Sequence, residues 1–144
     1  MKRIRIAQLG TTHEHASGTI EVARRLTDIF EVVGVVDDSA STTARQSKTV
    51  NLKPYEGLPL LTEEELLNRT DLDAVFVETT NDDLPAAALK CAERGFHMHM
   101  DKPGGQSMAP FAKIVDLCRR QKLVLQMGYM YRPNPALLFC RQIG

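Results

Sequence analysis

Short apolar runs of strand length alternate along the chain with longer segments in which apolar residues recur at helical spacing. The runs are IRIAQLG, EVVGVVD, DAVFVET, FHMHM and LVLQMGY, in that order. Strands that alternate with helices form a parallel sheet with helices on both faces. The sequence therefore predicts an α/β fold with a doubly wound parallel sheet in three layers, α/β/α. Ligands bind such sheets outside the carboxyl ends of the strands, so a site is expected there.

Six segments outside these runs are predicted to be helical. They are residues 13–28, the stretches SASTTARQSK and LTEEELL, residues 82–94, the segment after Ser107, and the tail PALLFCRQIG. Thr62 and Glu65 have the spacing of a capping box, and Gly95 is a stop signal. The expected buried faces are Ala16, Ile20, Val22, Ala23, Leu26 and Ile29; Leu84, Ala88 and Cys91; and Met108, Phe111, Val115 and Cys118.

Charge and composition exclude several classes of partner. Lys plus Arg and Asp plus Glu both number 18, so the formal net charge is zero and nothing attracts nucleic acid or an anionic membrane over long range. No apolar run approaches the roughly 20 residues that span a bilayer. The three cysteines lack the spacing of a zinc site or a disulfide framework. We expect a cytoplasmic protein with one core and a small-molecule partner.

The first candidate loop, GTTHEHASG, follows the first strand. A dinucleotide fingerprint has glycine at three positions, but only Gly10 is glycine here, and Thr12 and His15 stand in the other two places. The loop can bind phosphate through threonine hydroxyls and a helix N-terminus. It can equally be a plain strand-to-helix turn capped by Thr11 or Thr12, and the loop alone does not decide between these.

Histidines stand near two of the strands. Consecutive helical positions do not face one site, and the HExxH spacing is absent, so His13, Glu14 and His15 do not predict a metal site. His97 and His99 are two apart on a strand and share a face. We interpret both as sheet residues.

Asp37 closes the second strand, 27 residues after Gly10. A carboxylate at this place accepts hydrogen bonds from an adenosine ribose and repels the 2′-phosphate of NADP. In the alternative reading, Asp37 and Asp38 form a solvated turn and cap a helix after Ser39.

Lys102 follows the fourth run, in HMHMDKPGG. Its proline neighbour keeps its backbone extended, so the lysine is presented at the edge of the sheet. A surface charge is the commoner role of lysine. An ammonium at this edge can also stabilise a developing negative oxygen and transfer a proton. Pro103 fixes the backbone, in a trans or a cis bond, and Gly104 and Gly105 allow close approach.

Four segments together resemble the nucleotide-binding half of the glucose-fructose oxidoreductase, inositol dehydrogenase and rhizopine-catabolism family (Gfo/Idh/MocA). They are IAQLGTTHEHASG, VVGVVDD, VETTNDDLPAAALKCAERGFHMHMDKPGG and QMGYMYRPNP, and the resemblance covers essentially all 144 residues. It implies an NAD(P)-binding Rossmann domain at residues 1–128. Residues 129–144 would be the crossover segment and first helix of a substrate domain that is absent from this chain.

The resemblance also implies roles for the residues that follow the strands. The cofactor-binding residues would be Gly10, Thr11, Thr12, His13, Asp37, Asp38, Thr79, Thr80, Asn81, Asp101, Lys102, Pro103, Tyr131 and Arg132. Lys102 would be catalytic, and no metal is expected. Asp101 replaces the family's glutamate, Leu84 stands where the family often has histidine, and Thr12 and His15 replace glycines. The acid and the histidine that the family has in its second domain have no counterpart here.

Two functions are therefore weighed. The favoured one is the dinucleotide-binding domain of an oxidoreductase that transfers hydride between NAD, or less favourably NADP, and a sugar- or polyol-like alcohol or carbonyl. The isolated chain would then lack turnover. The alternative is a non-catalytic Rossmann module that senses nucleotide or binds protein. Homo-oligomer formation is left open.

Overall fold

The five predicted strands form one parallel sheet in the computed structural model, which describes residues 2–40 and 51–143. The strand order is β2-β1-β3-β4-β5. The strands are β1 (Ile4–Leu9), β2 (Phe30–Val36), β3 (Ala74–Val77), β4 (His97–Met100) and β5 (Leu125–Met127). Because every strand runs in the same direction, all five carboxyl ends lie at one edge. The α/β prediction is confirmed.

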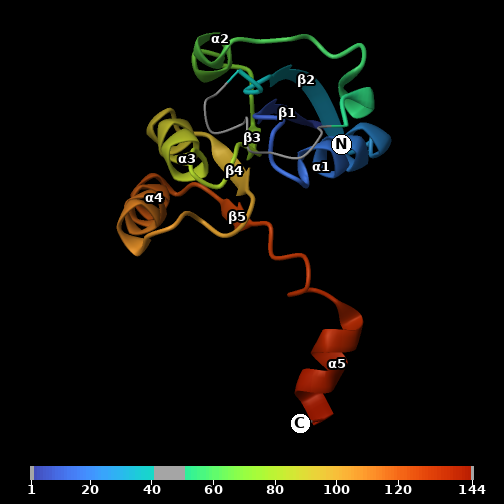
Figure 1. Ribbon diagram of the computed structural model, residues 1–144, viewed down its shortest axis with the longest axis vertical. Helices are drawn as coiled ribbons and strands as arrows, with labels where there is room; N and C mark the ends of the chain where they lie inside the picture. Colours follow the sequence, from blue (N-terminus) through green and yellow to red (C-terminus); the bar gives the residue numbers. More distant parts are fainter. Residues whose placement is uncertain (1, 41–50, 144) are drawn as a thin grey trace.

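Helices connect the strands and cover both faces of the sheet (Figure 1). They are α1 (Ala16–Arg25), the 3-10 helix η2 (Lys53–Tyr55), α2 (Glu63–Leu67), α3 (Leu84–Glu93), α4 (Met108–Gln121) and α5 (Pro135–Ile143). Helices α3 and α4 pack side by side on one face, and α1 packs beside β2 on the other. The predicted helix SASTTARQSK falls largely on residues 41–50, outside the described residues.

The main core lies between the sheet and the α3–α4 pair. Alternate strand residues such as Leu9, Val77 and Met100 pack against Leu84 and Ile114. A smaller cluster lies under α1, where Ile20 contacts Val35 and Tyr55. The period of two along the strands therefore divides the apolar side chains between two cores.

Most of the residues predicted to begin or end a helix are found in those positions. The Thr62 side chain accepts from Glu65 N, and the Glu65 carboxylate accepts from Thr62 N at 2.7 Å, so the capping box is confirmed. Gly95 follows α3 with φ +82°. Ser107 precedes α4 as predicted, but its side chain makes no capping hydrogen bond.

Two predicted helix faces need correction. In α1 only Ala16, Ile20 and Ala23 are buried. Val22 is exposed, because a residue two positions from Ile20 points to another side of the helix. Leu26 and Ile29 are exposed beyond the end of α1 at Arg25.

In α4 the buried residues are Ile114 and Cys118, which are one turn apart. Phe111, a turn earlier, is half-buried and packs on the same core. Met108 is 74% exposed, because it stands six positions before Ile114 and lies on another side of the helix. Val115 is only half-buried.

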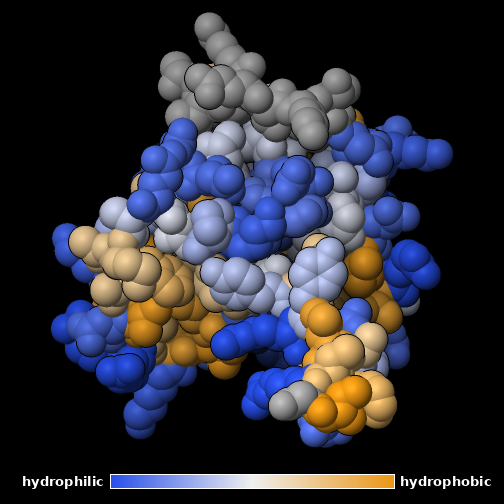
Figure 2. Space-filling view, turned by 60° about the horizontal axis from the view of Figure 1, so that its bottom comes forward, coloured by the Kyte–Doolittle hydropathy of each residue, from blue (hydrophilic) through white to orange (hydrophobic). Residues whose placement is uncertain are grey.

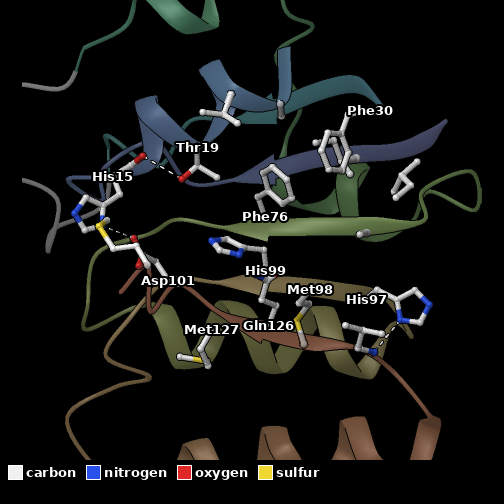
Figure 3. Close-up of a pocket in the computed structure, with 18 of the residues that line it drawn as sticks. His15, Thr19, Phe30, Phe76, His97, Met98, His99, Asp101, Gln126 and Met127 are labelled. Carbon is white, nitrogen blue, oxygen red and sulfur yellow. Dashed lines mark hydrogen bonds and ion pairs between the residues drawn. The ribbon is translucent and has the colours of Figure 1, made fainter. Parts of the chain in front are cut away.

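The α1 side of the sheet carries a hollow of about 1690 Å³ over β3, β4 and β5. Phe30, Phe76 and His99 follow one another across it (Figure 3). The ring centroids of Phe30 and Phe76 are 6.1 Å apart, and those of Phe76 and His99 are 5.6 Å apart. Helix α1 therefore covers only part of this face.

Helix α5 extends away from the sheet, and none of its residues is buried. Figure 2 shows hydrophobic side chains gathered at this end of the molecule. Leu137, Leu138 and Phe139 are 50%, 43% and 60% exposed. These three residues therefore form an exposed apolar patch on α5.

This patch predicts self-association of the chain. Contiguous exposed apolar surface favours burial against another molecule. The mass measured by light scattering is expected to rise with protein concentration, and Leu138→Gln is expected to reduce the rise. Val124→Gln, a substitution of another exposed apolar residue away from α5, is the control and should change little. A chain that stays monomeric at high concentration would contradict the prediction.

Candidate functional site

The loops that follow the strands converge at the carboxyl edge of the sheet. They begin with Gly10 after β1, Asp37 after β2, Glu78 after β3, Asp101 after β4 and Gly128 after β5. A parallel sheet brings these positions together although they are far apart in the sequence. This edge holds the candidate site.

Gly10 makes the first turn possible. Its φ is +97°, and a Cβ placed there would lie 2.6 Å from Thr79 N and 2.7 Å from the carbonyl carbon of Glu78. Real Cβ atoms do not approach backbone so closely, so only glycine fits this close crossing of β1 and β3. His13 N then donates to Glu78 O at 3.0 Å, which fixes the loop against β3.

Gln8 supports the same turn from below, and the sequence analysis did not select it. The side chain is fully buried, and Nε2 donates to Gly10 O at 2.9 Å and to Ala16 O at 3.3 Å. Nε2 also lies 2.9 Å from the hydroxyl oxygen of Tyr55. Gln8 could have been selected from the sequence, because it is a polar residue within the apolar run of a buried strand and must find hydrogen-bond partners there.

The donors of the first loop contact the two aspartates after β2. Thr11 N donates to Asp38 Oδ1 at 2.7 Å, and Thr12 Oγ1 donates to Asp38 Oδ2 at 2.6 Å. Thr11 Oγ1 donates to Asp37 Oδ1 at 2.8 Å. The loop thus presents an amide and two hydroxyls to carboxylate oxygens, the same donor set that binds phosphate oxygens.

Asp37 also accepts bonds from Ser39, whose N and Oγ both lie 2.9 Å from its oxygens. Burial raises the pKa of Asp37, but the hydrogen bonds from Ser39 and Thr11 outweigh it, so the pKa is lowered. The turn of the alternative reading is therefore present at Asp37, while the helix it would cap lies outside the described residues. The carboxylate also stands beside the loop, where the ribose reading requires it.

His13 and His15 converge on Asp101, which the sequence did not predict. His13 Nδ1 and His15 Nδ1 lie 2.8 and 2.9 Å from the same oxygen, Asp101 Oδ2 (Figure 3 shows the His15 contact). The expectation that these histidines would not face one site is wrong, because α1 begins only at Ala16 and the loop before it is not helical.

Burial and nearby charges shift the pKa values of His13 and Asp101. Burial opposes protonation of His13, but the hydrogen bond to Asp101 and the charge of that carboxylate outweigh it, so the pKa of His13 is raised. Burial also raises the pKa of Asp101, yet the bonds with His13 and from Lys102 N hold that pKa well below its usual range. Asp101 is therefore ionised between two imidazoles.

Glu78 is a second residue that the sequence analysis missed. It ends the apolar run of β3, is 0% exposed, and neither carboxylate oxygen has a hydrogen-bond partner among the described residues. Burial and the nearby Asp101 carboxylate raise its pKa to about 8. Its oxygens lie 3.9 Å from His13 Nδ1 and 3.7 Å from His99 Nε2. An acid between Val77 and Thr79, at the end of a buried strand, was the available signal.

Lys102 lies at the rim of this group. The Lys102–Pro103 bond is cis, one of the two geometries left open, and Lys102 N donates to Asp101 Oδ1 at 2.6 Å. Lys102 Nζ lies 3.0 Å from Glu14 Oε1, and the lysine side chain is 33% exposed. The lysine is therefore presented at the edge of the sheet, as predicted, and is paired with an acid from the first loop.

The other residues predicted to bind the cofactor lie at different distances from this cluster. Thr79 is buried beside Gly10, and Asn81 Oδ1 lies 3.2 Å from His13 Nε2. Thr80 Oγ1 donates to Asp83 at 3.1 Å, in the turn before α3. Arg132 lines the hollow, whereas Tyr131 is 67% exposed on the way to α5 and is not among the residues that line it.

The edge fits the phosphates of a dinucleotide. Gly10 keeps the turn tight, and the N-terminus of α1 has no side-chain cap and no acidic residue in its first turn. Such a helix end favours negative charge. The residues that would hold the group are the amide and hydroxyls of Thr11 and Thr12, with Asp37 toward a ribose.

Comparison with known proteins agrees with this geometry. The family model GFO_IDH_MocA, described as an oxidoreductase family with an NAD-binding Rossmann fold, matches residues 4–129. The chain is 24% identical over 122 residues to UDP-N-acetylglucosamine 3-dehydrogenase of Acidithiobacillus ferrooxidans, covering 85% of this chain and 37% of that protein.

Solved structures share the fold. The WlbA dehydrogenase from Chromobacterium violaceum, in complex with NADH and UDP-GlcNAcA, has a TM-score of 0.79 and 23% identity over 99% of this chain and 39% of its own. Biliverdin reductase from Synechocystis, in complex with biliverdin and NADP+, has a TM-score of 0.76 and 21% identity over 96% and 42%. The chain thus spans about two fifths of the length of these relatives.

Within residues 2–40 and 51–143, no helix is both long and apolar enough to cross a membrane. The family match covers the sheet, the first loop and the Asp-Lys-Pro segment, which together carry the site. The chain therefore belongs to the Gfo/Idh/MocA oxidoreductase family and forms its NAD-binding Rossmann domain.

Proposed function

We propose that this chain is the cofactor-binding part of a dehydrogenase that transfers hydride between NAD and an alcohol or carbonyl of a sugar-like substrate. The observation that carries the proposal is the convergence of the first loop with Asp37, through the 2.8 Å bond from Thr11 Oγ1. A ribose hydroxyl can donate to this carboxylate, while a 2′-phosphate would be repelled. This supports NAD over NADP.

The sugar-like substrate rests on relatives. UDP-N-acetylglucosamine 3-dehydrogenase is named for a sugar nucleotide, and the WlbA structure holds NADH with UDP-GlcNAcA. The relatives are more than twice as long as this chain, which covers 37% and 39% of their lengths. We therefore infer a substrate class and not a particular sugar.

In this mechanism Lys102 acts on the substrate oxygen. The nicotinamide, when bound, accepts or donates the hydride. The Lys102 ammonium stabilises negative charge on the oxygen and exchanges a proton with it. The pair with Glu14 holds Nζ at the rim, and this hydrogen bond to Lys102 lowers the pKa of Glu14.

A calorimetric titration of the 144-residue chain with NADH and, separately, with NADPH tests the proposal. Binding of NADH that is at least about ten times tighter than binding of NADPH is the expected result. Equal binding of both would overturn the preference for NAD.

The alternative function, a nucleotide-sensing or protein-binding module without catalysis, has one observation in its favour. Asp38 already accepts from Thr11 N and from Thr12 Oγ1, the donors that a phosphate would use. A chain in which Asp38 keeps these donors would bind neither dinucleotide. Failure of both titrations therefore favours the protein-binding form of this alternative.

The isolated chain is expected to show no turnover on sugar or polyol alcohols. Lys102 is present, but the family's second acid and histidine have no counterpart, and catalytic groups that act as a unit lose most of the rate when part of the set is missing. NADH formation is followed by absorbance with a panel of polyols and sugar nucleotides. Steady formation that depends on Lys102 would contradict the prediction.

A further inference from the structure

Four side chains from three loops meet beneath the first turn. His13 Nδ1 and His15 Nδ1 both contact Asp101 Oδ2, and one ligand atom from each of these three residues lies within 4.8 Å of the others. Glu78 Oε2 lies 3.9 Å from His13 Nδ1. Two imidazoles and two carboxylates are a common ligand set for zinc and similar divalent ions.

Glu78 is an independent sign that something is bound here. It is fully buried, and neither of its oxygens has a hydrogen-bond partner among the described residues. A buried carboxylate without a partner is costly, and in folded proteins such groups are usually paired or coordinate a metal. His13 and His99 are the bases closest to it, but at 3.9 and 3.7 Å neither is hydrogen-bonded to it.

The spacing is close to that of a tetrahedral site. Zinc bonds of about 2.0–2.1 Å place neighbouring ligand atoms about 3.4 Å apart. The two histidine–Asp101 distances of 2.8 and 2.9 Å are shorter than this, and the His13–Glu78 distance of 3.9 Å is longer. Shifts of about half an ångström would bring these three distances to the spacing expected around one ion.

The outer contacts also match a metal site. A metal-bound histidine commonly donates its second ring nitrogen to an oxygen, which fixes the ring. His13 Nε2 lies 3.2 Å from Asn81 Oδ1, and His15 Nε2 lies 3.7 Å from Glu14 Oε1. Asp101 uses its other oxygen, Oδ1, to accept from Lys102 N. His13 Nδ1, His15 Nδ1 and Asp101 Oδ2 therefore face one another, and Glu78 Oε2 lies beside His13 Nδ1, which also accepts from His15 N at 3.3 Å.

The charge of the four side chains and their access to solvent are also consistent with a bound divalent ion. A divalent cation balances the two carboxylates when both imidazoles are neutral. His15 is the most accessible of the four, with 32% of its side chain exposed, so an ion can enter from its side. We propose that His13, His15, Asp101 and Glu78 bind one divalent transition-metal ion of the zinc class, linking the first loop to β3 and β4. This proposal does not depend on dinucleotide binding.

The test is titration of the metal-stripped 144-residue chain with Zn²⁺ by calorimetry, without dinucleotide, and with Co²⁺ by visible absorption. One ion per chain and the strong visible bands of tetrahedral cobalt are expected. His15→Asn keeps a hydrogen-bonding side chain at a half-exposed position but removes the imidazole, and it should weaken binding at least about 10-fold.

His97→Asn is the matched control. His97 is exposed at the start of β4, away from the cluster, where its Nδ1 accepts from Val124 N. This variant should bind metal like the unchanged chain, and circular dichroism should show that both variants remain folded. No binding by the unchanged chain, cobalt spectra of a purely octahedral ion, or equal affinity of His15→Asn would overturn the proposal. Any of these outcomes would assign the cluster to hydrogen bonding alone.

Discussion

Gly10→Ala is expected to lower the free energy of unfolding by about 3 kcal/mol or more. An alanine at φ +97° costs about 1–2 kcal/mol on its own. Its Cβ would also lie within 2.8 Å of three backbone atoms of Glu78 and Thr79, which belong to the sheet edge and cannot move cheaply. Urea denaturation followed by circular dichroism measures the loss.

Gly57→Ala separates the two causes. Gly57 also has a positive φ, +76°, but a Cβ there meets nothing within 4 Å. It should therefore lose only the conformational part, about 1 kcal/mol. Equal losses in the two variants would show that the crossing of β1 and β3 can relax, and would contradict the role assigned to Gly10.

Asp37→Ala is expected to weaken NADH binding about 30-fold, which corresponds to about 2 kcal/mol. The variant would lose the charge-assisted bonds of this carboxylate to the ribose, and Thr11 Oγ1 would lose its nearer acceptor, at 2.8 Å, and keep Asp38 Oδ1 at 3.4 Å. NADPH should bind relatively better than before, because the charge that repels its phosphate is gone. Both affinities are measured by calorimetry.

Two further variants show which property of Asp37 matters. Asp37→Asn keeps an oxygen that can accept from Thr11 and Ser39 but removes the charge, so it should mainly relax the preference for NAD. Asp116→Ala removes an exposed carboxylate of α4 whose nearby cation is Arg120, and it should leave both affinities unchanged. An unchanged preference in Asp37→Asn would count against a role of this charge in cofactor choice.

The sequence predicted the parts of the fold that depend on local period. Strands with a continuous apolar run, helices with a 3.6-residue stripe and the capping box of α2 need little tertiary information. Gly10 and Lys102 could be placed for the same reason, because glycine and the residue before proline have restricted backbone roles.

The arrangement of the site depends on contacts between residues that are far apart in the sequence, and a short sequence pattern does not predict such contacts. His13 and His15 meet at Asp101 only because α1 begins after them, and a shift of a helix start by two or three residues lies within the usual uncertainty. Glu78 is buried at the end of β3, where the first loop crosses it and His13 N donates to Glu78 O. Val22 and Met108 were also predicted wrongly, because an apolar residue close in sequence to the buried face of a helix can still point to another side of that helix.

The contacts that close the site join segments at opposite ends of the sequence. His15 and Asp101 are 86 positions apart, Glu14 and Lys102 are 88 apart, and His13 and Asn81 are 68 apart. During synthesis these contacts cannot form until β4 has paired with β3, so a nascent chain ending before residue 97 lacks the Asp101 and Lys102 side of the site. Conversely, a ligand held at this edge slows hydrogen exchange of the whole sheet, because every opening that separates β1 from β4 also releases it.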